Sequence, residues 1–272
     1  MLTYEALLEQ AKIRQMPASK MRGVLREYLQ VLLLKALYKT EAGRKLYFTG
    51  GTYLRLAHDT KRFSEDLDFN TDSLAKASFE TVVRAAAVEL KRVNLRCVVG
   101  FRYFEKIYAA DMVFPDIEKL YGVVSSRTKK SGLLIKVETN TPSWKIVAET
   151  RVISGFGELY PCFCSQRGAL FADKIDALIK KTRARHLYDI IFMLSQGYPI
   201  DNNALRVLGI KEPPLEVIRG RVEGFSLSEL TKQAENLKPF LFEESDADMI
   251  INAHAVIPAL IEEYKRKTKE IK

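Results

Sequence analysis

Two short stretches of the sequence carry side chains whose types and spacing suit phosphate and metal chemistry. The first is the turn Gly50-Gly51-Thr52. Glycines at the start of a helix let backbone N–H groups approach a phosphate closely, and the helix dipole there also favours negative charge. This turn therefore predicts a nucleotide phosphate site.

The second stretch is Asp66-Leu67-Asp68-Phe69. In an extended strand, alternate side chains share a face, so both carboxylates would point one way and both apolar side chains the other. Two carboxylates this close repel each other unless a cation lies between them. Mg²⁺ prefers such hard oxygen ligands, and it completes its shell with water and substrate phosphate. Asp66 and Asp68 are therefore predicted to bind Mg²⁺ together with a nucleoside triphosphate.

Each stretch has a simpler interpretation when it is taken alone. An Asp-x-Asp pair is also typical of a solvated strand edge, and Gly-Gly is most often a plain turn. Thirteen residues lie between Thr52 and Asp66, which is enough for a short helix and a return loop to a neighbouring strand. The combination favours one joint site.

This arrangement resembles the nucleotidyltransferase superfamily with the DNA-polymerase-beta-like core, whose signature is a Gly-Gly or Gly-Ser turn, a short helix and an Asp-x-Asp strand. More closely, residues 48–70 resemble the AbiEii/AbiGii toxin family of bacterial toxin–antitoxin and phage-defence systems. In that family an Arg-x-Ser-x-Asp-Leu-Asp-Phe-like stretch follows the glycines. It is matched here by Arg62, Ser64, Asp66, Leu67, Asp68 and Phe69.

A second block, residues 172–190, resembles the later lysine and aspartate motifs of that family, and the ordered blocks together span residues 45–195. Lys174 and Asp189 fall on the family's functional positions. The resemblance implies that Lys174 contacts the triphosphate. The alternative is a solvent-exposed lysine on a helix, which is the commonest environment of lysine. Asp189 would face a cleft or pair with Arg185, four residues earlier. Many members have Arg-Asp shortly before the Tyr-Asp of this motif, whereas this chain has Arg185-His186. The first of the two aspartates in that motif is therefore replaced by a histidine in this chain.

The resemblance also implies further site residues. The polymerase-beta-like core commonly takes a third acid from a later strand, which makes Glu138 a candidate catalytic and metal-binding residue; the alternative is an ordinary strand-face glutamate beside Lys136. Ser64 either contacts the nucleotide or only caps the turn before the strand. The predicted catalytic residues are Asp66, Asp68, Glu138, Lys174 and Asp189. The predicted nucleotide-binding residues are Gly50, Gly51, Thr52, Arg62, Ser64 and Lys174.

The elements that must position these residues can be predicted from hydrophobic periodicity. Apolar residues three to four apart predict a helix over 21–41, and strands are expected at 45–49, 95–101, 107–114 and 133–139. From residue 168 on, helical periodicity dominates, with breaks at prolines. The expected fold is α+β: a polymerase-beta-like nucleotidyltransferase core of mixed sheet and flanking helices over 1–165, then a mainly helical domain over 166–272.

Composition agrees with a polyanionic partner. The 272 residues carry a formal net charge of +9, which favours nucleic acid although scattered lysines also simply solubilise a surface. Three basic clusters are candidate RNA contacts: Lys129-Lys130, the run Lys180, Lys181, Arg183 and Arg185, and Lys265-Arg266-Lys267. A solvated helix face is the alternative for each, and the middle cluster, near Lys174, is the strongest.

Other sequence features point to the cytoplasm. Three cysteines cannot all pair within the chain, and Cys162 and Cys164 lack metal-ligand spacing, so buried thiols in a reducing compartment are expected. The first residues lack the order of a signal peptide, and Val31-Leu32-Leu33-Leu34 is too short to span a bilayer. No membrane association is expected.

Together these features predict a toxin-type nucleotidyltransferase that moves a nucleoside monophosphate from a nucleoside triphosphate onto RNA, with the tRNA 3′ acceptor end as the expected target, and so halts translation. The resemblance implies a cognate antitoxin. Two alternatives stay open: the acceptor is a protein or small molecule, or the core is a non-catalytic nucleotide- or RNA-binding module. Intact Asp66, Asp68, Lys174 and Asp189 argue against the last.

Overall fold

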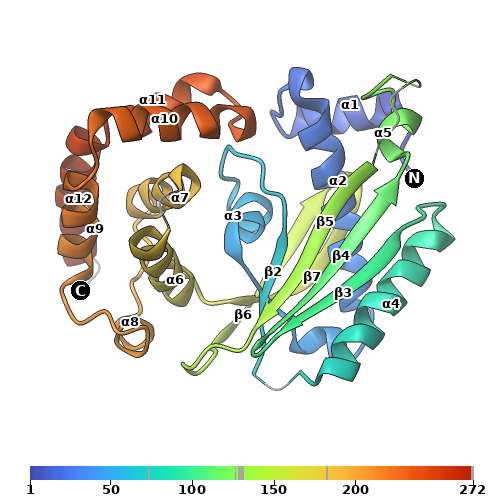
Figure 1. The fold of residues 1–272 in the computed structure, drawn as a ribbon, viewed down its shortest axis with the longest axis horizontal. Helices are drawn as coiled ribbons and strands as arrows, with labels where there is room; N and C mark the ends of the chain where they lie inside the picture. Colours follow the sequence, from blue (N-terminus) through green and yellow to red (C-terminus); the bar gives the residue numbers. More distant parts are fainter. Residues whose placement is uncertain (73, 126, 128–131, 182, 271–272) are drawn as a thin grey trace. The chain divides into compact units, whose positions relative to one another are not determined.

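The computed structural model describes residues 1–72, 74–125, 127, 132–181 and 183–270. By its internal contacts the chain forms two compact units, Met1–Ser165 and Gln166–Lys272. The first unit runs from blue to yellow in Figure 1 and the second from yellow to red. Lys129 and Lys130, one of the basic clusters predicted to contact RNA, lie outside the described residues, as does Thr182, which lies between Lys181 and Arg183 of the middle cluster.

The first unit is built on one seven-stranded sheet with the order β3-β4-β5-β2-β1-β7-β6. Strands β2 and β5 are parallel, as are β1 and β7, and the other neighbours are antiparallel. The strands are β1 (Tyr47–Thr49), β2 (Leu67–Asn70), β3 (Val98–Phe104), β4 (Ile107–Pro115), β5 (Gly132–Asn140), β6 (Ala148–Gly155) and β7 (Glu158–Ser165).

The helices of the first unit are α1 (Tyr4–Ile13), α2 (Met21–Tyr38), α3 (Gly50–His58), α4 (Lys76–Arg92) and α5 (Ile117–Leu120), with 3₁₀ turns η1 (Ala18–Lys20) and η2 (Ala42–Lys45). Helices α2 and α4 pack on one face of the sheet. Tyr38 of α2 contacts Phe69 of β2 at 6.4 Å between ring centroids, and Phe79 of α4 contacts Phe101 of β3 at 6.2 Å. In Figure 1, α4 runs along β3.

The alternation of side chains along β5 separates the two faces of the sheet. Leu133, Ile135 and Val137 are fully buried on the face that the helices cover, whereas Leu134 is exposed and Lys136 is partly exposed. Such alternation is what a strand with one buried face requires. The face opposite α2 and α4 therefore carries the polar side chains of β5.

The regular elements that the structure describes in the second unit are all helices. Its elements are α6 (Arg167–Lys180), α7 (Ala184–Ser195), α8 (Asn202–Val207), α9 (Pro214–Glu223), α10 (Leu227–Leu237), η3 (Lys238–Phe240), η4 (Glu244–Ala247), α11 (Asp248–Ile251) and α12 (Ala253–Glu270). Local signals define several boundaries. Asp201 caps α8, Ser226 and Glu229 form a capping box at the start of α10, and α9 begins with Pro214.

The predicted fold class is confirmed: a mixed sheet with flanking helices is followed by a helical C-terminal part. Two strands begin later than predicted, each for a local reason. The strand expected from residue 45 begins at Tyr47 because η2 occupies Ala42–Lys45, and the strand expected from residue 95 begins at Val98 because the N–H of Leu95 still bonds the carbonyl of Leu90 at the end of α4. Among the described helices, none is long and apolar enough to cross a membrane.

Candidate active site

The glycine turn lies between β1 and α3 and packs directly against the Asp-x-Asp segment. Gly50 opens α3 with φ +79°, and a Cβ there would lie 2.3 Å from Oδ2 of Asp68. A Cβ at Gly51 would lie 2.5 Å from Nη2 of Arg62 and 2.8 Å from Oγ of Ser64. The position of Gly50 therefore favours glycine for its left-handed backbone as well as for space. A Cβ at Gly51 would instead displace the ends of the Arg62 and Ser64 side chains. The turn gathers three other predicted site residues around the start of α3.

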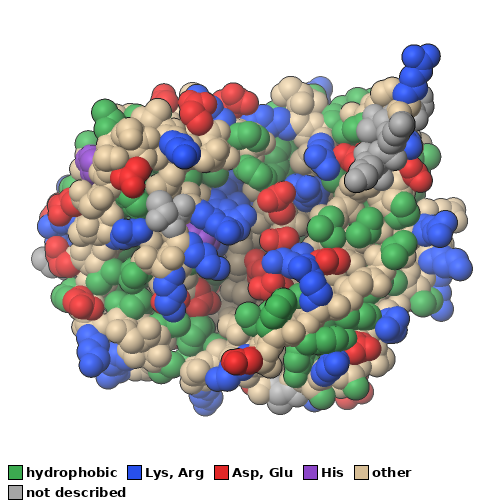
Figure 2. Space-filling view, in the orientation of Figure 1, with side chains coloured by type: hydrophobic (Ala, Val, Ile, Leu, Met, Phe, Trp, Pro, Cys, Tyr) green, Lys and Arg blue, Asp and Glu red, His purple; other side chains and the backbone are tan. Residues whose placement is uncertain are grey.

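The two aspartates lie at the start of β2. Asp68 pairs in register with Thr49 of β1 and with Glu138 of β5, while Asp66 directly precedes the strand. The intervening Leu67 and the following Phe69 are buried on the face that the helices cover. Asp68 and Glu138 are thus neighbours on the opposite face. In Figure 2 acidic side chains gather beside lysine and arginine over the region of β2 and β5.

Lys136 of β5 lies among these carboxylates. Its Nζ is 2.8 Å from Oε2 of Glu138 and 4.0 Å from Oδ2 of Asp66. Partial burial alone would lower the pKa of Lys136, but the hydrogen bond to Glu138 and the negative charges of Asp66, Glu138 and Asp68 outweigh it and raise the pKa. The ammonium group therefore keeps its charge and neutralises part of the acidic cluster.

This arrangement bears on how a metal could be held. Within the described part of the chain, no group of three or more His, Cys, Asp or Glu side chains gathers as a metal site. Glu138 pairs with Lys136, and its predicted catalytic and metal-binding role stays a prediction. Asp68 lies against Gly50 and Asp66 directly precedes the same strand, and one or two protein carboxylates are the usual complement for Mg²⁺ bound with phosphate. The donor set fits one hard divalent ion at this pair.

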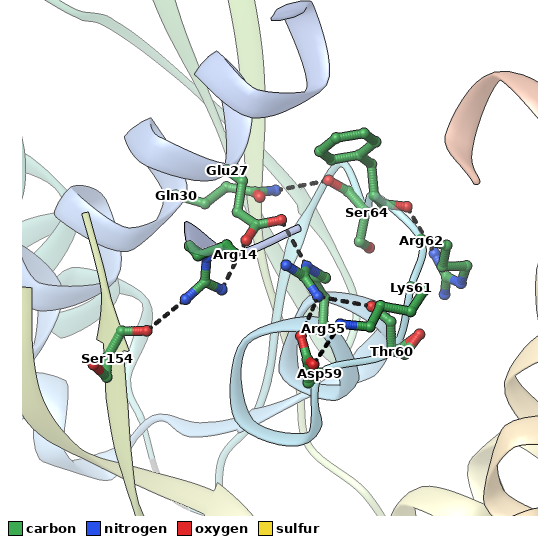
Figure 3. Close-up of polar contacts among 11 residues, drawn as sticks. Arg14, Glu27, Gln30, Arg55, Asp59, Thr60, Lys61, Arg62, Ser64 and Ser154 are labelled. Atoms are coloured by element: carbon green, nitrogen blue, oxygen red, sulfur yellow. Dashed lines mark hydrogen bonds and ion pairs between the residues drawn. The ribbon is translucent and has the colours of Figure 1, made fainter. Parts of the chain in front are cut away.

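Thr52, Arg62 and Ser64 support the loop that leads to the aspartates. Thr52 is fully buried and its hydroxyl donates to the carbonyl of Asp66. Nη1 of Arg62, also buried, donates to the carbonyl of Phe63 at 3.0 Å, and Nε2 of Gln30 donates to the carbonyl of Ser64 at 3.1 Å (Figure 3). These contacts fix the course of residues 62–66. The nucleotide contacts predicted for the three side chains stay predictions.

A second layer of this support was missed by the sequence reasoning. Arg55 of α3 is 1% exposed, and its Nε donates to Oε2 of Glu27 on α2 at 2.9 Å. Its Nη1 donates to Oδ1 of Asp59 at 2.7 Å and to the carbonyl of Thr60 at 3.0 Å (Figure 3). Arg14 reaches the same Glu27 carboxylate at 2.9 Å. The available signal was a charged residue inside the apolar run of α3, because such a residue is seldom buried without a partner.

In the second unit, Lys174 of α6 and Asp189 of α7 form an ion pair. Nζ of Lys174 is 2.7 Å from Oδ2 of Asp189, whose side chain is 0% exposed. The two residues singled out by the second motif block are therefore direct partners. Asp189 was expected to face a cleft or to bond Arg185, and this stays a prediction; one partner that the structure shows for it is Lys174.

The basic clusters differ in their surroundings. Lys180 pairs with Asp176 at 2.8 Å, whereas Lys181 and Arg183 are exposed around the end of α6 and the start of α7. In α12, Lys265 and Lys267 each pair with a glutamate of the same helix, at 2.9 and 2.7 Å. Paired lysines along one helix are typical of a solvated face. The run that ends at Arg185 stays the stronger candidate for RNA.

Comparison with known proteins supports the assignment of the fold and of the family. A family model described as "Nucleotidyl transferase AbiEii toxin, Type IV TA system" matches residues 32–251. The comparison with curated proteins gave no match.

Two solved structures share the fold over nearly the whole chain. MenT4, a nucleotidyltransferase toxin from Mycobacterium tuberculosis, is 18% identical, with a TM-score of 0.59 over 98% of this chain and 93% of its own. JHP933 from Helicobacter pylori is 15% identical, with a TM-score of 0.54 over 92% of this chain and 96% of its own. At such identities the likeness concerns the fold.

Proposed function

Because the chain belongs to the AbiEii family of nucleotidyl transferase toxins of type IV toxin–antitoxin systems, we propose that it is a Mg²⁺-dependent toxin that transfers a nucleoside monophosphate from a nucleoside triphosphate to RNA. The proposed acceptor is the 3′ end of tRNA, and the consequence is a block of translation in the cytoplasm. The family implies a nucleotide substrate and a cognate antitoxin.

The observation that carries the proposal is the contact between the glycine turn and the aspartates. Gly50 and Gly51 begin α3 with no side-chain cap from Thr49, and Asp68 lies against Gly50. The first N–H groups of a helix bind phosphate readily. A triphosphate at this helix start would lie beside two carboxylates suited to its metal ion.

Each residue then has a limited task. Asp66 and Asp68 would hold the ion, and Lys136 keeps part of the acidic charge neutralised. When bound, Mg²⁺ would offset triphosphate charge and lower the pKa of the attacking hydroxyl. Lys174, oriented by Asp189, supplies an ammonium group for the triphosphate. The RNA 3′ oxygen forms a bond to the α-phosphorus as the bond to pyrophosphate breaks, a reaction that depends mainly on positioning and charge.

The proposal of an RNA acceptor is supported by charge. The net charge of +9 gives a long-range attraction for polyanions, and Lys181, Arg183 and Arg185 provide basic side chains within one to five residues of the end of α6. Phosphate contacts of this kind grip an RNA without reading its sequence.

The proposal is tested by incubating the purified protein with bacterial RNA, Mg²⁺ and each α-³²P-labelled nucleoside triphosphate in turn. A labelled tRNA-sized band is expected with wild type and not with the Asp66→Ala/Asp68→Ala variant or after chelation with EDTA. Pyrophosphate release without labelled RNA would contradict the RNA acceptor and indicate a protein or small molecule. Nucleotide binding with no pyrophosphate release would contradict the catalytic role.

A further inference from the structure

A cavity of about 260 Å³ lies within the second unit, at the start of α7 and the end of α10. Two arginines, Arg183 and Arg185, line it from the α7 side. Gln233 and Asn236 of α10 and Phe240 of η3 line it from the other. None of these residues belongs to the glycine turn, the acidic cluster or the Lys174–Asp189 pair.

Gln233 gives this cavity the character of a binding site. Its side chain is 8% exposed, and among the described residues its Nε2 has no hydrogen-bond partner. A buried donor left without an acceptor is destabilising, so native proteins nearly always satisfy such groups. An acceptor atom of a ligand inside the cavity would satisfy it.

The charge of the lining selects an anionic ligand. Arg183 and Arg185 each contribute a guanidinium group, and none of the described residues that line the cavity is acidic. Guanidinium groups match phosphate oxygens in geometry and charge. A triphosphate that carries Mg²⁺ would need carboxylates for its metal, which this lining lacks, so a phosphodiester fits better than a free nucleoside triphosphate.

The remaining side chains suit a nucleobase. The ring of Phe240 offers a surface for stacking, and the amides of Gln233 and Asn236 can donate to and accept from the edge of a base. An aromatic ring, amides and arginines are the side chains that bind unpaired RNA nucleotides.

The position on α7 connects this cavity with the proposed reaction. Arg185 and Asp189 are four residues apart on α7, so they lie on the same side of the helix, one turn from each other. The cavity is thus within one helical turn of the Lys174–Asp189 pair.

We propose that this cavity binds one unpaired nucleotide of the acceptor RNA. Arg183 and Arg185 hold its phosphate, Phe240 stacks on its base, and Gln233 and Asn236 bond the base edge. This inference rests on the proposed function, because it names the part of the protein that holds the RNA acceptor during nucleotidyl transfer.

The test measures binding of fluorescently labelled bacterial tRNA to the full-length protein by anisotropy, at several salt concentrations and without nucleotide. The variants are Arg185→Met and Gln233→Leu, both close in volume to the native side chains. The control is Lys232→Met, which removes one positive charge from an exposed neighbour of Gln233 on α10. Circular dichroism melting checks that all variants fold.

We expect Arg185→Met to weaken tRNA binding about tenfold and to reduce the slope of log affinity against log salt by about one, because one phosphate contact is lost. Gln233→Leu should weaken binding by about threefold to tenfold with an unchanged slope, because an uncharged hydrogen bond is lost. Lys232→Met should stay within about twofold of wild type.

Equal affinities for Arg185→Met, Gln233→Leu and Lys232→Met would overturn the inference. A loss of affinity for a fluorescent nucleoside triphosphate with unchanged tRNA affinity would overturn it too, since the cavity would then bind the donor. Label transfer by wild type, measured in parallel, separates the two proposals. Transfer to RNA with unaltered variant affinities refutes only the cavity assignment, whereas no transfer to RNA refutes the proposed function itself.

Discussion

Lys174 and Asp189 form a buried ion pair that joins helices α6 and α7, with 2.7 Å between Nζ and Oδ2. Both side chains are almost inaccessible to solvent. A buried pair of this kind is weak support for stability, since hydrophobic residues often replace one without loss. The catalytic role proposed for Lys174 is therefore a separate question from the effect of the pair on stability.

Replacing Lys174 by Met separates these two roles. The free energy of unfolding should fall by about 3 kcal/mol, because the buried carboxylate of Asp189 loses its cation. Nucleotidyl transfer should fall with it. In the double variant Lys174→Met/Asp189→Leu the stability should largely return, but the activity should not. Urea unfolding followed by circular dichroism and label transfer measure the two quantities, and an active double variant would exclude Lys174 from the chemistry.

Gly50→Ala should impair the reaction through Asp68. A Cβ at Gly50 would meet Oδ2 of Asp68 at 2.3 Å, so the carboxylate must move, and kcat/KM should fall at least about 100-fold. The matched control is Gly157→Ala. Gly157 has φ +80° but a Cβ there would meet no described atom within 4 Å, so it should cost about 1 kcal/mol of stability and leave activity intact. Equal activities of the two variants would contradict this account of Gly50.

Lys136→Met should tighten the binding of a divalent cation. The ammonium group lies 2.8 Å from Glu138 and 4.0 Å from Asp66, so its loss removes a positive charge that competes with the metal. We expect the affinity for Mn²⁺, measured by isothermal titration calorimetry, to rise about tenfold. Lys106→Met, at an exposed turn residue, serves as the control. Equal Mn²⁺ affinities would show that Lys136 does not affect the metal site.

Asp173→Asn should change how stability depends on pH. Burial raises the pKa of Asp173 from 3.8 to about 7. Between these values the native state holds a proton that the unfolded state releases, so the contribution of Asp173 to stability is present at low pH and is lost as pH rises toward 7. The variant should therefore gain on the order of 1 kcal/mol over wild type at pH 8 and little at pH 4. Parallel stability curves from urea unfolding at each pH would contradict the shift.

The sequence predicts best what depends on local pattern. The strand that contains Asp68 and the helix that begins at Gly50 follow from alternation and from a glycine turn, because period two and a left-handed backbone are properties of short segments. The α+β class followed for the same reason, since strand and helix periodicities mix only in the first part of the chain.

Contacts between distant segments could not be predicted in this way. Arg55 and Glu27 are 28 residues apart, and the sequence around each residue does not indicate that they pair. The same holds for the cavity between Arg185 and Gln233, which depends on how α7 and α10 pack. Glu138 was predicted to bind metal because the resemblance implies a third acid on a later strand, and nothing in the pattern indicated Lys136 as its partner. That it bonds Lys136 depends on two rotamers that a sequence pattern does not encode.

The central claim is that this chain adds a nucleotide to RNA through the carboxylates beside its glycine turn. The most direct measurement is the intact mass of a purified bacterial tRNA after incubation with the protein, Mg²⁺ and the four nucleoside triphosphates, with 3′-end sequencing of the product. The account predicts that wild type adds nucleoside monophosphate at the 3′ end and that Asp66→Ala and Asp68→Ala add none. An unchanged tRNA mass with wild type, or equal addition by the two variants, would contradict it.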